Sequence, residues 1–142
     1  MTGRQSPRGG LLGAVATSRH EVRSGGARGE AAAGRLLDLV FDWIRACFHP
    51  ERTGGQSGVF HYEVSTPGGV RHRWVVVADG RCEVTGEAPA DGEDSTIAVE
   101  LEDLVALAVG EITGSQAFVG GRLKISGDIY FAMNWTAWFG AD

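Results

Sequence analysis

Hydrophobic and polar residues follow two different periods along this chain, and each period predicts one kind of element. From residue 34 to residue 49, apolar side chains recur every three or four positions, as on the buried face of an amphipathic helix. His49-Pro50 should end this helix, because a residue before proline avoids the helical conformation. The apolar face is made by Leu36, Leu37, Val40, Phe41, Trp43, Ile44, Cys47 and Phe48.

A period of two replaces the helical period after residue 58 and predicts a series of strands. The Asp79-Gly80 pair is a strong signal for a two-residue hairpin loop. The run Trp74-Val75-Val76-Val77 is apolar at every position, which indicates a strand that is buried on both faces. The four strands expected in this part are residues 59–65, 70–78, 81–86 and 95–99.

The helical period returns in the C-terminal third of the chain. We expect Gly110 to end the first helix there and Ser115 to cap the second. A run of strands followed by a run of helices predicts an α+β domain, with a five-stranded, mainly antiparallel sheet and helices on one side. The expected elements are a helix at 101–109, a helical turn at 117–119, a strand at 123–125, and a helix from Gly127 or Asp128 to about Phe139.

Composition separates a tail from a domain. The chain has 142 residues and a formal net charge of −5. Residues 1–33 are rich in glycine and arginine and have little apolar surface to bury, so we expect a disordered tail at 1–33 and one domain at 34–142. The acidic balance argues against nucleic acid as a partner, because phosphate backbones are held by clustered basic surfaces. No apolar run approaches the ~18 residues of a membrane span.

The cysteines and histidines offer little sign of chemistry. Cys47 and Cys82 lack CxxC spacing, and we interpret both as buried thiols of a cytoplasmic protein. His61 and His72 lie on adjacent predicted strands and, with Glu63, would supply three donors for a metal ion. We favour a solvated role for these histidines and predict no metal and no cofactor. The reason is strand alternation, which we expect to place both histidines on the other face of the sheet from Phe60, Tyr62 and Trp74.

Three segments, taken in order, resemble the sterol carrier protein 2 (SCP2) domain family over about residues 34–139. The hairpin at 74–80 is similar to the turn between the family's second and third strands. The segment 104–112 is similar to the family's apolar helix, which ends in a glycine and a short charged-apolar step. The third segment matches a Phe, a Gly, a Leu-Lys-Ile strand, a Gly and an Ala-Met helix, here Phe118, Gly121, Leu123, Lys124, Ile125, Gly127, Ala132 and Met133.

This resemblance implies an SCP2-like fold that encloses a hydrophobic cavity. It also implies non-enzymatic binding and transfer of an apolar ligand, which would be a sterol, a fatty acid or a fatty acyl-CoA-like lipid. Pockets of this kind are mostly apolar, with few orienting polar groups. Carried over by position, the ligand-binding residues are expected to be Leu104, Leu107, Phe118, Leu123, Ile125, Phe131, Met133 and Trp135.

Two further expectations concern partners and the alternative function. The last predicted helix is unusually aromatic, and exposed aromatic patches mark contact sites, so a homodimer through this helix and transient membrane contact both stay open. The alternative function is a small enzyme, or an accessory domain, that acts on an apolar metabolite in the same cavity. Such an enzyme needs an acid, base or nucleophile in the pocket, and Tyr130, Asp128 and Cys82 are the candidates.

Overall fold

Five strands form a mixed sheet in the computed structural model, which describes residues 26–139. Their order across the sheet is β3-β2-β1-β4-β5. The β1–β4 pair is parallel and the other pairs are antiparallel, so the predicted five-stranded, mainly antiparallel sheet is confirmed. The strands are β1 (Gly58–Thr66), β2 (Gly69–Ala78), β3 (Arg81–Thr85), β4 (Ser95–Glu100) and β5 (Leu123–Gly127).

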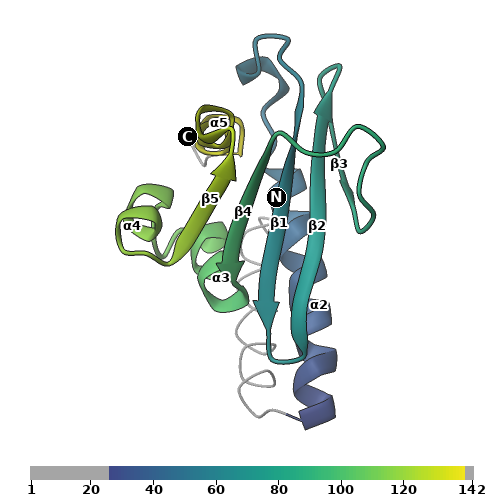
Figure 1. The fold of residues 1–142 in the computed structure, drawn as a ribbon, viewed down its shortest axis with the longest axis vertical. Helices are drawn as coiled ribbons and strands as arrows, with labels where there is room; N and C mark the ends of the chain where they lie inside the picture. The colour runs from purple at the N-terminus through teal and green to yellow at the C-terminus, as the bar shows by residue number, and fades with distance from the viewer. Residues whose placement is uncertain (1–25, 140–142) are drawn as a thin grey trace, which may run out of the picture.

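The helices of the described residues gather on one face of this sheet and at its β5 edge. Figure 1 shows α2 and α3 behind the strands, with α4 and α5 beside β5. The other face of the sheet carries no helix within residues 26–139. This arrangement confirms the predicted α+β class. The helices are α2 (Gly26–Ala46), the short 3-10 helix η1 (Pro50–Arg52), α3 (Leu101–Val109), α4 (Gly114–Val119) and α5 (Ile129–Phe139).

Helix α2 begins at Gly26, inside the segment that the sequence predicts as tail. Alanine has the highest helix propensity, and Ala32 and Ala33 are buried, so this segment is held by packing as well as by propensity. The domain boundary expected at residue 34 is therefore too late. The rest of the predicted tail, residues 1–25, lies outside the described residues.

The hydrophobic core lies between the helices and the inner face of the sheet. Phe60, Tyr62 and Val64 alternate along β1 toward the helices, as predicted, and all three are fully buried. The Phe60 ring lies 4.5 Å from the Phe131 ring of α5, centroid to centroid. Burying an aromatic or branched side chain of this size stabilises the fold by about 1.5–3 kcal/mol. The strand alternation and the aromatic face of α5 thus fix α5 against β1.

The predicted turns around β2 and α3 are confirmed. Asp79 and Gly80 form the loop between β2 and β3 with φ angles of 54° and 74°. Two positive φ angles in succession are typical of the hairpin turns that match strand twist. Gly110 follows α3 with a φ of 83° and ends that helix.

The caps of the last two helices agree with the sequence in one case only. The expected Ser115 cap of α4 is wrong, because Thr113 precedes the helix and caps it. The Gln116 N–H donates to the Thr113 hydroxyl at 3.1 Å, and the Thr113 N–H donates to the Gln116 side-chain oxygen at 2.9 Å. Asp128, one of the two residues expected to open the last helix, caps α5, since its carboxylate accepts the Phe131 N–H at 3.0 Å.

The apolar run of β2 is covered by helices on one face only. Val75 and Val77 point into the core, whereas Val76 is half-buried on the uncovered face. The expectation that Trp74 and His61 lie on different faces of the sheet is also wrong, because the two residues are register partners and share a face. Their rings stack at 4.6 Å with an interplanar angle of 7°, and this contact leaves His61 only 7% exposed. An aromatic stack therefore replaces the second covering layer that the apolar run indicated.

Candidate functional site

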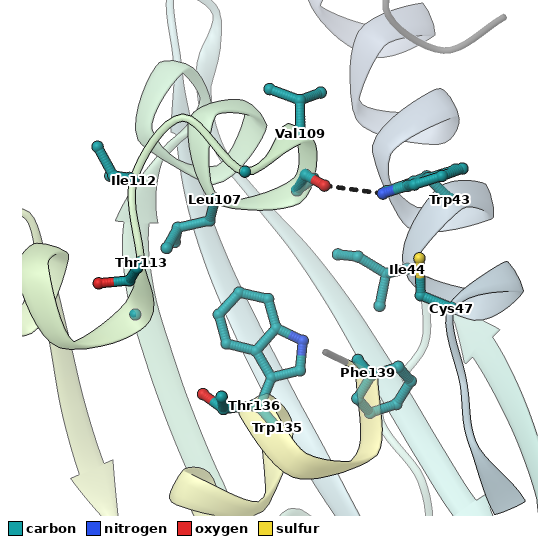
Figure 2. A pocket seen from close by; sticks show the side chains of 13 residues that line it. Trp43, Ile44, Cys47, Leu107, Val109, Ile112, Thr113, Trp135, Thr136 and Phe139 are labelled. Atoms are coloured by element: carbon teal, nitrogen blue, oxygen red, sulfur yellow. Dashed lines mark hydrogen bonds between the residues drawn. The ribbon is translucent and has the colours of Figure 1, made fainter. Parts of the chain in front are cut away.

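A hollow of about 250 Å³ opens between three helices at one end of the core. Figure 2 shows its walls, which come from the C-terminal ends of α2 and α3, the segment between α3 and α4, and one side of α5. Apolar side chains dominate the lining, as in sites for hydrophobic ligands. The lining residues are Trp43, Ile44, Cys47, Leu107, Ala108, Val109, Gly110, Ile112, Thr113, Gly114, Trp135, Thr136 and Phe139.

The ends of α2 and α3 are joined directly at this pocket. The Trp43 indole N–H donates to the Ala108 carbonyl oxygen at 2.8 Å, the bond drawn as a dashed line in Figure 2. This bond satisfies one of the last α3 carbonyls, which have no partner inside the helix. Because Gly110 ends α3 at this point, the chain turns and Thr113 and Gly114 complete the lining. The ends of α2 and α3 and the turn after Gly110 thus form this side of the pocket.

Trp135 of α5 supplies an unusual polar group inside this apolar lining. Figure 2 shows its indole between Leu107 and Phe139, with the ring nitrogen turned toward the α2 side. That nitrogen is buried and has no hydrogen-bond partner among the described residues. Leaving a buried donor unsatisfied costs about 1–3 kcal/mol, so the site favours a ligand that brings an acceptor.

A second unsatisfied donor lies beneath Trp135. The Tyr62 ring packs edge-on against Trp135 with centroids 5.8 Å apart, and its buried hydroxyl has no partner within the described part of the chain. Burial raises the pKa of the Tyr62 hydroxyl well above its usual value, so the group stays protonated and able to donate. Tyr62 does not line the pocket itself, so this uncharged donor lies in the core, packed against Trp135.

The lining contains little that could perform acid–base chemistry. Cys47 is the one titratable side chain among the described residues that line the pocket. The predicted catalytic candidates lie elsewhere: Tyr130 is 86% exposed, and Asp128 caps α5. Cys82 is buried on β3, and burial raises the pKa of its thiol to about 11. None of these three candidates lines the pocket.

The structure brings two of the eight predicted ligand-binding residues into the pocket lining, namely Leu107 and Trp135. Leu104, Leu123 and Phe131 are buried in the core, and Ile125 is half-buried on β5. Phe118 and Met133 are 50% and 64% exposed on α4 and α5. Contact between these six residues and a ligand stays a prediction, since it requires a site that extends beyond this pocket.

Sequence reasoning missed the contribution of α2 to the pocket. Trp43, Ile44 and Cys47 fit the helical period of a core face, and the structure confirms that α2 packs on the core. The helical period alone does not show at which end a helix separates from the neighbouring helices and leaves a pocket. A signal was present in Trp43, because an indole that packs against the core needs an acceptor and the end of a helix supplies one.

No disulfide joins the two cysteines in the described residues. Cys82 is buried, as expected, whereas the expected burial of Cys47 is wrong, because this residue is half-buried at the pocket. Across residues 26–139, no helix combines the length and the hydropathy that crossing a lipid bilayer requires.

Comparison with solved structures places the fold among the sterol carrier domains. The solution structure of palmitated SCP2L2 from Aedes aegypti superposes with a TM-score of 0.57 and 26% sequence identity, over 67% of this chain and 86% of that one. A stereoselective inverting sec-alkylsulfatase, Pisa1 from Pseudomonas sp., gives a TM-score of 0.63 at 15% identity, over 77% of this chain and 17% of that chain. At that identity the second likeness shows the fold alone.

Sequence comparison then identifies the family. The model of the SCP-2 sterol transfer family matches residues 49–140, which is more than half of the chain. Sterol carrier protein 2 from Oryctolagus cuniculus is 37% identical over 110 residues, which cover 72% of this chain and 20% of that protein. The chain belongs to the SCP-2 sterol transfer family, and it matches about a fifth of the length of this relative.

Proposed function

We propose that this chain binds an apolar ligand that carries a hydrogen-bond acceptor, and that it transfers the ligand without covalent chemistry. The ligand class is a fatty acid, a sterol or a fatty acyl-CoA-like lipid. One observation carries the proposal: Trp135 lines the apolar pocket of α2, α3 and α5, and its buried indole N–H has no partner among the described residues. An apolar tail would contact the walls while an acceptor on the ligand receives that hydrogen bond.

The comparisons support this ligand class. The Aedes aegypti neighbour is described as palmitated, so a fold similar to this one takes up a fatty acid. Membership of the SCP-2 sterol transfer family points in the same direction. The pocket volume of about 250 Å³ lies just below the ~300–1,000 Å³ typical of small-molecule sites. A long ligand would therefore need the walls of the pocket to move apart.

The lining argues for carriage rather than catalysis. A catalytic site would place an acid, a base or an activated nucleophile against the ligand. Cys47 is the one titratable group found in the described lining, and no second titratable group stands with it there. The alternative, an accessory domain of a larger enzyme, is supported by the likeness to a segment of the sec-alkylsulfatase, which is a likeness of fold only. Cytoplasmic placement stays part of the proposal, since two cysteines without a disulfide are typical of a reducing compartment.

We further propose that the ligand is exchanged at a membrane surface. Apolar side chains of α4 and α5 are exposed in the structure, and α4 starts at the pocket rim. Exposed apolar patches mark contact sites, and a lipid surface is the source of the proposed ligand. Co-sedimentation with neutral phosphatidylcholine vesicles tests this step, whereas dimerisation in sedimentation velocity would assign the patch to a second copy. The exposed side chains are Phe118, Val119, Ile129, Tyr130 and Met133.

Native mass spectrometry of the full chain, purified without detergent, tests the proposed function. We expect an added mass that organic extraction removes and that lipid analysis identifies as a fatty acid or a sterol. The extracted lipid should be recovered chemically unchanged after incubation with the protein. A chain that carries no ligand and fails to take up a fluorescent fatty acid at micromolar concentration would contradict the carrier function. Chemical conversion of the lipid would instead favour the alternative function, an enzyme that acts on an apolar metabolite.

A further inference from the structure

The uncovered face of the sheet, opposite the pocket, holds three potential metal ligands. His61 and Glu63 are two residues apart on β1, so they point to the same face. His72 of β2 is the register partner of Glu63 and therefore lies beside it. One donor atom from each of these residues can be chosen so that all three lie within 4.8 Å of one another. The adjacent strands β1 and β2 thus hold the three residues close together.

The two imidazoles already face each other at a distance close to what a shared ion requires. His61 Nε2 lies 2.9 Å from His72 Nδ1. Two nitrogens that each bind zinc at about 2.0–2.1 Å stand roughly 3.3 Å apart in a tetrahedral site. A small opening of the pair would therefore admit an ion between them. Glu63 is half-buried, and rotation of its side chain would bring a carboxylate oxygen to the same point.

The surroundings of His61 orient its ring for this role. On the far side of the ring, Nδ1 lies 3.1 Å from the Thr96 hydroxyl and 3.4 Å from the Glu93 carboxylate. Glu93 is itself held, because it accepts the Trp74 indole N–H at 3.1 Å. With its proton on Nδ1, His61 presents the Nε2 lone pair to His72. Histidine ligands in metal sites are commonly fixed in this way by a carboxylate on the second ring nitrogen.

We propose that His61, Glu63 and His72 bind one late first-row divalent cation, with Zn²⁺ as the ion of choice and water completing the coordination. Two imidazoles and a carboxylate form a donor set that suits zinc, copper and nickel and does not suit magnesium. In the absence of the ion, the neutral His72 ring donates from Nδ1 to His61 Nε2. On binding, that proton moves to His72 Nε2, so both facing nitrogens offer lone pairs and no net proton is released by the pair. This site does not depend on the proposed lipid function.

The chain contains a matched control for the experiment. His49 and Glu51 have the same spacing as His61 and Glu63, and His49 Nδ1 lies 3.4 Å from the Glu51 carboxylate. This pair does not belong to the three-donor group found among the described residues. If a His-x-Glu pair alone were enough for binding, the chain would bind a second Zn²⁺ at His49 and Glu51, and His72→Ala would have no effect. If the three residues form the site, His72→Ala should weaken zinc binding and His49→Ala should not. His72 is exposed, and its ring contacts His61 and Trp74, so the fold of this variant is verified separately.

Zinc titration of the full chain, freed of affinity tags and treated with EDTA, tests the proposal at pH 7.5. We expect one equivalent of Zn²⁺ to bind at micromolar concentration or tighter, and Mg²⁺ not to compete. His72→Ala and Glu63→Gln should each weaken zinc binding about tenfold or more, whereas His49→Ala should leave it unchanged. Circular dichroism verifies that each variant is folded. Equal zinc affinity in the wild type, His72→Ala and Glu63→Gln would overturn the proposal.

Imidazole NMR signals provide a second readout that does not depend on mutation. Zn²⁺ should shift the ring resonances of His61 and His72 together, in slow or intermediate exchange, and leave those of His49 in place. Shifts of His49 alone, or no imidazole shifts at saturating zinc, would contradict the site. Trp135→Phe should bind zinc like the wild type, because the pocket lies on the other face of the sheet.

Discussion

Trp135 is a side chain whose close packing leaves a polar group without a hydrogen bond. Its ring is held by Tyr62 and by the walls of the pocket, yet its N–H lacks a partner among the described residues. A phenylalanine would fill much of the same space without leaving a donor unsatisfied. The presence of tryptophan is thus explained if a ligand supplies the acceptor.

Trp135→Phe should weaken binding of dodecanoate while leaving the affinity for dodecane unchanged. A hydrogen bond to a charged acceptor contributes about 1.5–3 kcal/mol, which corresponds to roughly 10–100-fold in affinity. Displacement of a fluorescent fatty acid measures both ligands in both proteins. If the two ligands lose affinity equally, Trp135 acts through shape alone and the proposed hydrogen bond is absent.

Gly127 is a residue whose replacement tests the fold itself. Its φ is 80°, and a Cβ atom there would come within 2.8 Å of the Asp94 carbonyl oxygen. Gly127→Ala should therefore lower the free energy of unfolding by more than the ~1–2 kcal/mol that a left-handed alanine costs. Gly121→Ala is the control, since its φ is 73° but no atom lies within 4 Å of the added carbon. Urea denaturation compares the two, and equal losses would show that the Asp94 contact is relieved at little cost.

At the scale of elements, the sequence predicts which helices and strands exist better than it predicts where each one begins and what it contacts. Strand alternation correctly assigned Phe60 and Tyr62 to the core, because one residue of slip would expose the whole set. The start of α2 was missed because Ala32 and Ala33 carry too little hydrophobicity to mark a buried face, although they pack in the core. The stack of Trp74 on His61 was also missed, because it depends on strand register.

The sheet face predicts a pH dependence of stability through His61. Burial lowers the pKa of His61 below its ordinary 6.5, although the Glu93 carboxylate opposes this shift. The unfolded chain then binds a proton more readily than the native one, so stability is complete above pH 6.5 and falls as the pH drops below it. In EDTA, urea midpoints should fall from pH 7.5 to pH 5.5 more steeply for the wild type than for His61→Gln. Parallel slopes would mean that His61 is not the group responsible.

At the scale of the whole molecule, the sheet separates two chemically different regions. The helical face holds the apolar pocket, and the uncovered face holds the histidine cluster. Family resemblance led to the apolar ligand class, because glycine positions and strand segments are visible in sequence. The pocket's location was less accessible, because it depends on how the ends of α2 and α3 meet α5. This is why Leu107 and Trp135 were found while Trp43, on a distant segment, was not.

The most direct test of the central claim compares fatty acid affinity in two matched variants. Leu107→Gln places an amide in the pocket wall, whereas Met133→Gln makes the same kind of change on α5 outside the described lining. Loss of apolar contact worth about 1.5–3 kcal/mol predicts roughly 10–100-fold weaker binding of a fluorescent fatty acid to Leu107→Gln. Met133→Gln should bind within about twofold of the wild type if the ligand stays in this pocket. Wild-type affinity in Leu107→Gln would contradict the proposed site, and a large loss in Met133→Gln alone would move it to the exposed side of α5.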